Sequence, residues 1–485
     1  MSKNDSVLEQ YPSYECVIGI EVHVQLNTAT KIFCTCANAI VNEPNQNICQ
    51  ICTGHPGILP VLNKRVVSDA ILAGLATHSH ISPLSEFARK HYFYPDLPKS
   101  YQITQNDKPI CTDGYVSIYN EAGERKDVRL MRIHIEEDAG KNIHSGLSNE
   151  SFVDLNKAGT PLLEIVTYPD IASAFQARAY LKALRLIVQY LGICSGNMED
   201  GAFRADTNIS VRKKGASVFG TRVELKNINS FKFISDAIEY EIERQIELLE
   251  DGELVKQETR LWDTKHHKTI LMRSKEEAAD YRYFPDPDLP LIVIEQKEID
   301  SIAHTLPELP LQKFERFCAH GLSAYEAEIL VDDLELANYF DAACKHSASK
   351  SLINWVLRDI IALLKEQKIS LANCKVTPEK LAQLIDLLEK DSINNRAAQE
   401  IFAVVAQTGQ MPLDIMREKG LEQIGITDEL ESIIKGIVAQ YPEQVAEYKA
   451  GRDRVFGFFV GEAMKRSKGK GNPKIIQDLL RKYMS

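Results

Sequence analysis

Four cysteines near the N-terminus have the spacing of a metal-binding knuckle. They follow the pattern Cys34-x-Cys36-x12-Cys49-x2-Cys52, whereas the rest of the ten cysteines are scattered singly. Two close pairs joined by a short loop can place four thiolates tetrahedrally around zinc. Free cysteines are commonly buried for other reasons, but two close pairs at this separation favour a metal. Because all four ligands would be protein thiolates, the pattern predicts a closed, structural Zn²⁺ site.

A second group of residues could bind a hard cation. Glu21 and His23 point to the same face of one expected strand, Glu136 lies on the polar face of another, and Glu164 is isolated among apolar residues. Three carboxylates and one imidazole would suit Mg²⁺ or Mn²⁺ if they converged. Spacing does not show convergence. On spacing alone the preferred interpretation is simpler: Glu164 pairs with an arginine, and His23 makes hydrogen bonds only within the sheet.

The C-terminal region is strongly basic. A stripe of apolar residues between Val455 and Ala463 predicts a helix. The cations that follow it are Lys465, Arg466, Lys468 and Lys470. Cations at a helix C-terminus interact favourably with the helix dipole, so they are also expected without any ligand. The alternative is contact with a phosphate backbone, which would position a nucleic acid without reading its bases. The sequence leaves both interpretations open.

The elements that must position these residues predict an α+β fold. Strands are expected at 15–26, 131–137, 203–211 and 222–226, because apolar and polar residues alternate in each. In the second of these strands, Met131 and Ile133 are expected on the packed face. The polar faces carry His, Arg, Asp, Asn and Gln, which favours a functional open face over a merely solvated one. Helices at 172–190 and 235–249 should cover the packed face.

Three regions of the chain differ in their expected secondary structure. Residues 1–294 are strand-rich and predict an antiparallel-sheet domain, residues 295–407 predict an all-helical domain, and residues 408–485 predict a helical tail. Prolines in the run 281–290 mark the first boundary, and a Gly- and Pro-containing loop at 407–412 marks the second. With 485 residues, about two to four domains are expected.

Composition favours a cytoplasmic globular protein. No run approaches the ~18 apolar residues of a membrane span, and the first residues show no apolar signal core. Clustered cysteines in such a chain indicate metal binding in preference to disulfides. The net charge of −11 excludes a uniformly basic surface but not a local phosphate-binding patch. No Gly-rich nucleotide loop, protein-kinase motif, nucleophile elbow or amidase signature is present, so any use of ATP would need an unusual scaffold.

Long uninterrupted motifs resemble the GatB family, the B subunits of tRNA-dependent amidotransferases. These motifs are VIGIEVHVQL (17–26), HYFYPDLPKSYQITQ (91–105), IHIEEDAGK (133–141), DLNKAGTPLLE (154–164), FRADTNISV (203–211), VELKNINSF (223–231) and DYRYFPDPDLP (280–290). The basic tail resembles the YqeY-like module that ends this family. The resemblance therefore covers nearly the whole chain, from an α+β cradle domain to a helical tRNA-binding tail.

This resemblance implies a glutamine-hydrolysing carbon–nitrogen ligase that uses ATP. Such proteins phosphorylate the side-chain carboxylate of Glu-tRNA(Gln) or Asp-tRNA(Asn), because an acyl phosphate has a better leaving group than a carboxylate. Ammonia then displaces phosphate to give Gln-tRNA(Gln) or Asn-tRNA(Asn). The implied partners are a GatA-like glutaminase subunit, which frees the ammonia, and a GatC-like subunit. The implied cofactors are ATP, Mg²⁺ (or Mn²⁺) and structural Zn²⁺.

Roles carry over from the family residue by residue. The Mg²⁺ ligands match Glu21, His23, Glu136 and Glu164, which replaces the simpler interpretation drawn from spacing. The residues expected to take part in the chemistry are Glu136, Lys99, Arg204 and Lys226. Among these, Arg204 and Lys226 are expected near phosphate, and Lys99 with the acidic run 136–138 is expected where ammonia arrives. The basic tail residues are expected to bind tRNA.

One departure and two rival interpretations remain. Family members often have Glu where this chain has Gln25, which removes a potential charge but none of the four ligands. A mitochondrial-type member is disfavoured because no Arg-rich presequence is seen. A non-catalytic tRNA-binding scaffold is disfavoured by the intact ligand set. The sequence does not discriminate between Glu-tRNA(Gln) and Asp-tRNA(Asn), and it assigns no residue to the nucleotide.

Overall fold

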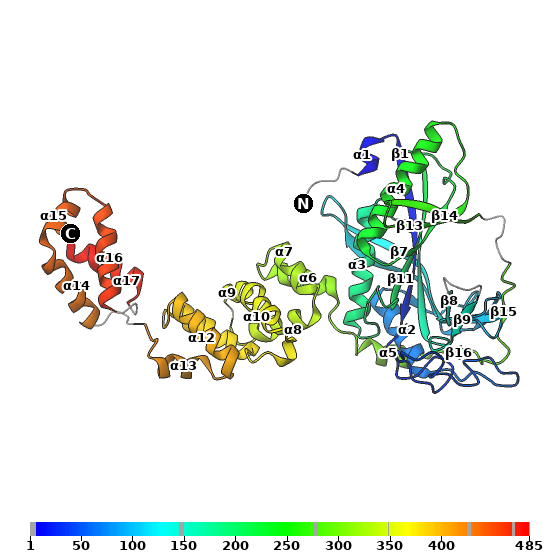
Figure 1. The fold of residues 1–485 in the computed structure, drawn as a ribbon, viewed down its shortest axis with the longest axis horizontal. Helices are drawn as coiled ribbons and strands as arrows, with labels where there is room; N and C mark the ends of the chain where they lie inside the picture. The colour runs from blue at the N-terminus through cyan, green and yellow to red at the C-terminus, as the bar shows by residue number, and fades with distance from the viewer. Residues whose placement is uncertain are drawn as a thin grey trace. The chain divides into compact units, whose positions relative to one another are not determined.

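The chain folds into two units, Met1–Lys313 and Phe314–Ser485. The computed structural model describes residues 6–144, 150–274, 280–347, 349–423, 428–467 and 471–484 (Figure 1). The first unit contains the sheet and the second is helical. The boundaries expected at 294/295 and 407/408 stay predictions.

A large mixed sheet organises the first unit. Among the described residues it has nine strands in the order β14-β13-β12-β11-β1-β10-β7-β6-β2. Their bounds are β1 Tyr14–Gln25, β2 His80–Ile81, β6 Cys111–Tyr119, β7 Arg125–Glu137, β10 Pro161–Thr167, β11 Phe203–Lys213, β12 Val223–Ile228, β13 Glu258–Asp263 and β14 Lys268–Ser274. Neighbouring strands pair antiparallel except β12 and β13, which run parallel. The expected antiparallel sheet is therefore confirmed, with this one exception.

Helices pack on the apolar face of the sheet. These are α2 (Lys64–Ala76), α3 (Ala174–Tyr190) and α4 (Phe231–Glu250), whose buried residues join those of the strands in one core. In β1 the buried and less buried residues alternate throughout, as the sequence predicted. Helix α4 begins at Phe231 instead of 235, because the Ser230 side chain caps it by accepting a hydrogen bond from the Phe233 amide.

Three small sheets and two short helices complete the described part of the first unit. A three-stranded sheet has the order β15-β4-β5, and the pairs β16·β3 and β8·β9 form two-stranded sheets. The bounds are β3 Leu84–Ser85, β4 Ala88–His91, β5 Tyr101–Thr104, β8 Lys141–His144, β9 Ser151–Asp154, β15 Phe284–Pro285 and β16 Ile292–Val293, with short helices α1 Val7–Gln10 and α5 Gln296–Ala303. Side chains of β5 hydrogen-bond to the end of β7, so the polar face of the large sheet is partly covered there.

Met131 departs from its expected position. It was predicted on the packed face, but its side chain is 38% exposed, whereas Leu130 is fully buried. The register between β10 and β7 shifts between Val166 and Thr167, whose partners are Arg132 and Leu130. A β-bulge inserts one extra residue into a strand and changes which side chains face inward. The prediction for Met131 was wrong because strict alternation does not anticipate a bulge.

The second unit is helical in all its described elements. Their bounds are α6 Pro310–Ala319 (which begins in the first unit), α7 Ala324–Val331, α8 Leu334–Cys344, α9 Ser351–Asn354, a π-helical turn Trp355–Ile360, α10 Ile361–Gln367, a 3₁₀ turn Leu371–Asn373, α11 Pro378–Glu389, α12 Asn395–Thr408, α13 Pro412–Lys419, α14 Asp428–Gln440, α15 Pro442–Lys449, α16 Arg454–Arg466 and α17 Pro473–Met484. Helices α14, α16 and α17 enclose a hydrophobic cluster of their own. None of the described helices combines the length and apolarity needed to cross a lipid bilayer.

Candidate active site and metal centres

Strand register brings the predicted cation ligands together. His23 of β1 lies opposite Glu164 of β10, and Glu164 lies opposite His134 of β7. On the other side of β1, His23 lies opposite Arg204 of β11. Directly opposed residues have their Cβ atoms about 5 Å apart and share a face. Four adjacent strands therefore present one continuous polar row.

The four predicted ligands converge on the imidazole of His23. Its Nε2 lies 3.3 Å from Glu164 Oε2, 3.4 Å from Glu136 Oε1 and 3.7 Å from Glu21 Oε1. Glu136 and Glu164 are both buried. Among the described residues, the ion-pair partners of Glu164 are His23 and His134 and do not include an arginine. The pairing with an arginine that spacing alone had favoured for Glu164 is therefore wrong, whereas the partners of His23 all lie on strands of the large sheet, as that interpretation expected.

A second imidazole faces the same carboxylates. His134 Nε2 lies 3.4 Å from Glu164 Oε2 and 3.8 Å from Glu136 Oε2, and His134 is buried. Burial disfavours the charged form of both imidazoles, but Glu136 and Glu164 outweigh it and raise the pKa of His23 and of His134 to about 9. In turn, although burial opposes it, the imidazoles lower the pKa of Glu164. The buried negative charge is thus compensated locally.

This donor set fits a divalent hard cation. Ligand atoms of His23, Glu136 and Glu164 lie within 4.8 Å of one another, and so do those of Glu21, His23 and Asp206. Carboxylate oxygens with a few imidazole nitrogens are the donors that Mg²⁺ and Mn²⁺ prefer. The two groups share His23, so they form one larger cluster, the metal cluster.

A cavity of about 510 Å³ opens next to the metal cluster, and His23 and Glu136 lie in its wall. The expected phosphate contacts also line it, and both already have carboxylate partners. Arg204 Nη2 lies 3.2 Å from Asp138 Oδ1, and Lys226 Nζ lies 2.6 Å from Asp206 Oδ2. These two cations are therefore placed at the cavity but neutralised within the structure.

Lys99 lies apart from this cavity. Its ammonium pairs with Glu137, and it lines a separate small recess together with Cys34 and Cys52. Asp138 lies in the walls of both spaces. The structure therefore does not bring Lys99 to the metal cluster, although the acidic run 136–138 connects the two. Gln25, the departure from the family pattern, donates its side-chain amide to Asp138 at 2.9 Å.

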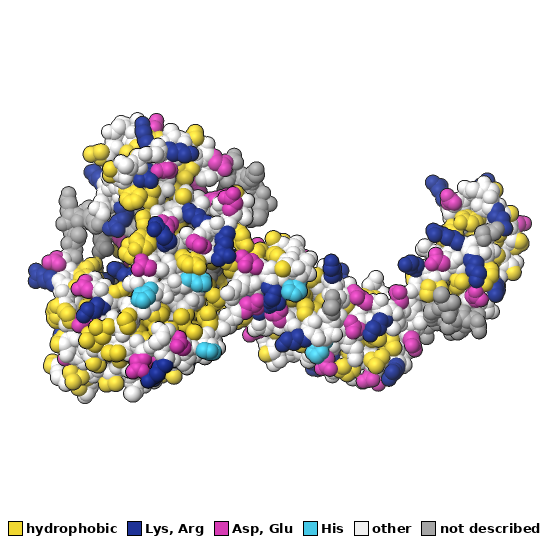
Figure 2. Space-filling view, turned by 180° about the vertical axis from the view of Figure 1, so that it is seen from behind, with side chains coloured by type: hydrophobic (Ala, Val, Ile, Leu, Met, Phe, Trp, Pro, Cys, Tyr) yellow, Lys and Arg dark blue, Asp and Glu magenta, His cyan; other side chains and the backbone are white. Residues whose placement is uncertain are grey.

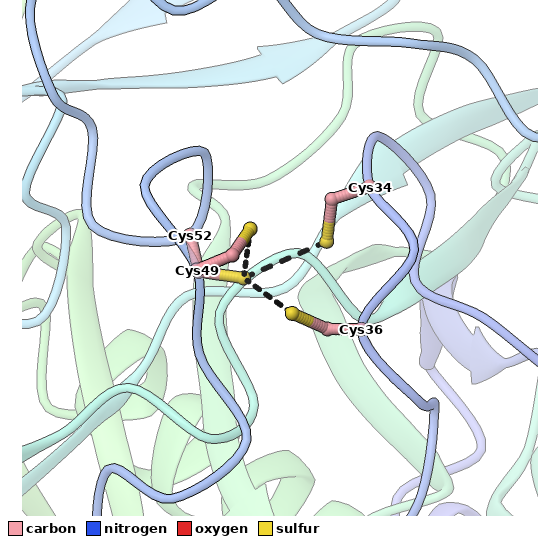
Figure 3. Close-up of side chains that lie close together, drawn as sticks. All are labelled: Cys34, Cys36, Cys49 and Cys52. Atoms are coloured by element: carbon pink, nitrogen blue, oxygen red, sulfur yellow. Dashed lines mark hydrogen bonds between the residues drawn. The ribbon is translucent and has the colours of Figure 1, made fainter.

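The four predicted zinc ligands meet around Cys52. Figure 3 shows the sulfur of Cys52 joined to those of the other three cysteines. The distances from Cys52 Sγ are 3.6 Å to Cys34, 3.9 Å to Cys36 and 3.8 Å to Cys49. A tetrahedral centre with Zn–S bonds of about 2.3 Å would have sulfur–sulfur edges of about 3.8 Å. The geometry of this group, the cysteine cluster, therefore suits a closed four-thiolate metal site.

A buried lysine adjoins the cysteine cluster. Lys31 is 1% exposed, and its ammonium donates to the Asn47 carbonyl at 3.0 Å and to Cys52 Sγ at 3.5 Å. The hydrogen bond from the Cys34 thiol, with help from this ammonium, holds the pKa of Cys52 well below its usual range. A buried cation needs negative charge nearby. Lys31 therefore matches a cluster of thiolates better than one of neutral thiols.

The predicted tRNA-binding cations fall at the end of α16. Lys465 and Arg466 are exposed, and Arg466 pairs with Glu462 at 3.2 Å. Lys468 and Lys470 lie outside the described residues. Figure 2 shows lysine and arginine side chains spread over one face of the tail helices, with acidic side chains among them.

Sequence reasoning missed several residues of this site. It placed His134 and Asp206 on polar strand faces but gave them no role, and it overlooked Lys90 and Tyr92, which line the cavity. His134 lies two residues before Glu136 on an alternating strand, so the sequence could have predicted that both side chains share a face. The nearer aromatic neighbour of Lys90, Tyr281, comes from a distant part of the chain, so the sequence around Lys90 did not reveal it.

Comparison with known proteins adds an independent result. Residues 16–300 match the family described as GatB/GatE catalytic domain, and residues 338–484 match the GatB domain. The chain is 52% identical over 476 residues to the B subunit of the aspartyl/glutamyl-tRNA(Asn/Gln) amidotransferase of Geotalea daltonii, covering 97% of this chain and 99% of the relative. The B subunit of the same enzyme from Myxococcus xanthus is 49% identical over 473 residues, covering 97% and 98%. This protein belongs to the GatB family.

Proposed function

We propose that the protein is the B subunit of an amidotransferase that converts Glu-tRNA(Gln), Asp-tRNA(Asn) or both to the amidated forms. The observation that carries this proposal is the end-to-end similarity to relatives of that name, with all four expected cation ligands converging beside one cavity. The partners are then a GatA-like glutaminase and a GatC-like subunit, and the complex works with the translation machinery of the cytoplasm.

The chemistry proposed at the cavity is activation of a carboxylate by ATP. Glu21, His23, Glu136 and Glu164 would hold Mg²⁺ or Mn²⁺, which would neutralise charge on the phosphates during transfer. Strand register brings these side chains close together, and the burial of Glu136 and Glu164 would limit competition from water there, which supports the proposal. Mn²⁺ would use the same donors.

Cations on the cavity wall would then receive phosphate. Lys226 is held by Asp206 and by Glu224, at 2.6 and 3.1 Å. Although burial opposes it, these carboxylates raise the pKa of Lys226, so it stays charged. Arg204, which is 44% exposed, would exchange its contact with Asp138 for a phosphate oxygen. The same exchange for Lys226 would be harder because it has two partners.

Ammonia would reach the cavity past the acidic run. Lys99, which is partly exposed, and buried Glu137 form an ion pair in the small recess, and the next residue, Asp138, borders both the recess and the cavity. Groups that alternate acceptors and donors can pass a small polar molecule. We assign Lys99 a role in this passage, as the family resemblance implied.

The remaining parts would support this reaction. The cysteine cluster would hold structural Zn²⁺. The bound metal would fix Cys34 and Cys52, which line the recess beside Lys99. The tail from 408 to 485 would contact the tRNA backbone through Lys465, Arg466, Lys468 and Lys470. Domains at 1–294, 295–407 and 408–485 would correspond to catalysis, linkage and tRNA contact.

The test is an amidation assay that bypasses glutamine. The chain is co-expressed with its A and C partners and given Glu-tRNA(Gln), ATP, Mg²⁺ and ammonium without glutamine. Formation of Gln-tRNA(Gln) is expected, which would place activation and amide transfer at this subunit's cavity. A parallel assay uses Asp-tRNA(Asn). If an assembled complex amidates neither substrate, the proposal is wrong and the scaffold interpretation stands.

A Glu136→Gln variant separates catalysis from binding. It keeps the shape of the side chain but removes one cation ligand, so product formation should fall by at least two orders of magnitude while tRNA binding is retained. Lys64→Gln, which alters a lysine that is 87% exposed on α2, serves as the control. Normal amidation by Glu136→Gln would contradict the assigned role of the metal cluster.

A further inference from the structure

One cation in the cavity wall has no role in the function proposed above. Lys90 belongs to β4, where it lies opposite Gln102 of β5, and both residues line the cavity. The side chain is only partly exposed. It therefore reaches the cavity from the small three-stranded sheet, whereas Arg204 and Lys226 reach it from the large one.

Lys90 differs from the other cavity cations in its partners. Arg204 and Lys226 are both ion-paired with carboxylates. Within the described part of the chain, Lys90 has no carboxylate within the 4.0 Å limit of an ion pair. Its Nζ instead lies 4.9 Å from the ring centre of Tyr281 and 6.0 Å from that of Tyr92.

Aromatic neighbours hold a cation in place without neutralising it. The faces of Tyr281 and Tyr92 attract an ammonium, but they accept no strong hydrogen bonds from its three donors. Burial disfavours the charged form of Lys90, yet the nearby carboxylates, Glu136 first, outweigh it and raise its pKa. The ammonium is therefore charged, partly desolvated, and next to a space large enough for a ligand.

We propose that Lys90 binds a substrate oxyanion beside the metal cluster. This inference rests on the function proposed above, which supplies two oxyanions at this place: the side-chain carboxylate of the aminoacyl group and the terminal phosphoryl group of ATP. An ammonium hydrogen-bonds either one through the same charge-assisted contact. Lys90 can do so without first breaking an ion pair, which Arg204 and Lys226 cannot.

The test uses the complete complex with its A and C partners. Lys90→Met removes the charge but keeps the length of the side chain, Lys90→Arg keeps the charge, and Lys64→Met is a control on an exposed lysine. With ammonium as the nitrogen donor, Lys90→Met is expected to lower kcat/KM for Glu-tRNA(Gln) on the order of 10- to 100-fold. Lys90→Arg should recover part of this loss, and Lys64→Met should match the wild type.

Equilibrium binding separates the two oxyanions. If Lys90 holds the terminal phosphoryl group, Lys90→Met weakens binding of Mg·ATP but not of Mg·ADP. If it holds the carboxylate, both nucleotides bind normally, uncharged tRNA(Gln) binds normally, and the KM for Glu-tRNA(Gln) rises. Either result supports the proposal.

Two further outcomes are decisive. Unchanged kinetics and unchanged nucleotide binding in Lys90→Met would overturn the proposal. So would equal damage in Lys90→Met and Lys90→Arg together with loss of zinc or of complex assembly, because that pattern indicates a structural role. Failure of the proposed function itself would be visible separately, since the wild-type complex would then form no amidated tRNA.

Discussion

At the scale of single residues, the site is governed by charge compensation. Glu136 and Glu164 are buried, and a buried carboxylate is costly unless it is paired. His23 and His134 supply that pairing from two different strands. Removing one partner would leave the other charge uncompensated, so this cluster tolerates few substitutions. Such intolerance is expected of a site kept for binding a cation and not for stability.

The cysteine cluster gives a prediction about zinc. Cys49→Ser should reduce bound zinc from about one equivalent to none, and should lower the melting temperature of the first unit, because structural zinc contributes folding energy directly. Zinc content by elemental analysis and thermal unfolding check this. Cys344→Ser, which alters an exposed cysteine of α8, is the control. A variant that keeps its zinc would show that Cys49 is not a ligand.

Asp69 predicts a pH dependence of stability. Burial raises the pKa of this α2 carboxyl to about 6, despite its ion pair with Arg65. A raised carboxyl pKa means that the folded state binds the proton more tightly, so stability falls as pH rises from about 4 to 6. Asp69→Asn removes this loss and should gain up to about 2–3 kcal/mol relative to wild type across that window.

Urea unfolding at several pH values measures this difference. The chain has two tryptophans, Trp262 in the first unit and Trp355 in the second. A Trp355→Phe background therefore lets fluorescence follow the first unit alone. Asp107→Asn, which alters an exposed carboxylate, should leave the pH profile unchanged. A constant difference between Asp69→Asn and wild type over this window would rule out the assignment.

At the scale of elements, strand register decides which residues meet. Alternation in β1 placed Glu21 and His23 on one face, as the sequence predicted. What alternation could not supply was the pairing of His23 with Glu164 and of Glu164 with His134, because register depends on contacts between distant segments. The ligand set was therefore reached through family resemblance, while local patterns alone pointed to the wrong partner for Glu164.

Other features of the fold also depend either on one short segment, which the sequence can predict, or on distant segments, which it cannot. The spacing of Cys34, Cys36, Cys49 and Cys52 lies within one short segment, so the sequence predicted that group correctly as a cluster. The bulge at Met131 and the contact of Lys90 with Tyr281 involve partners far along the chain. Local patterns therefore predict elements and short-range clusters, but the cavity depends on how the large sheet and the three-stranded sheet meet.

The start of α4 provides a prediction at this scale. Residues 227–229 line the cavity directly before the cap of this helix. Ser230→Ala removes the capping hydrogen bond to Phe233 and should cost about 1 kcal/mol of stability. Because the cap fixes the adjoining loop, we also expect lower amidation activity in the full complex.

Ser173→Ala is the comparison, since Ser173 also caps its helix, α3, and α3 does not line the cavity. The Ser173 hydroxyl in addition donates a hydrogen bond to Glu121, which this variant also loses. It should lose at least as much stability, measured by urea unfolding, and keep its activity. Equal activity of the two variants would show that the 227–229 loop does not depend on the start of α4.

At the scale of the whole molecule, chemistry and tRNA contact are assigned to different units. The cavity and both candidate metal sites lie in the first unit, and the basic end of α16 lies in the second. The net charge of −11 means that tRNA must be attracted by local patches and not by the protein as a whole. Mutations in the two units should therefore affect different steps.

Lys465 allows this separation to be tested. It is exposed, and no ion pair with another described residue neutralises it, whereas Arg466 is paired with Glu462. Lys465→Glu should weaken binding of tRNA to the full complex and reduce the salt dependence of log K by about one unit, as expected for losing one phosphate contact. Filter binding at several salt concentrations measures both, and kcat at saturating tRNA should stay unchanged because the cavity is intact.

Lys390→Glu, at the end of α11, controls for charge reversal on an exposed helix end. Equal effects of the two variants would mean that the attraction is general, and a lower kcat with unchanged affinity would mean that the tail acts on the chemistry.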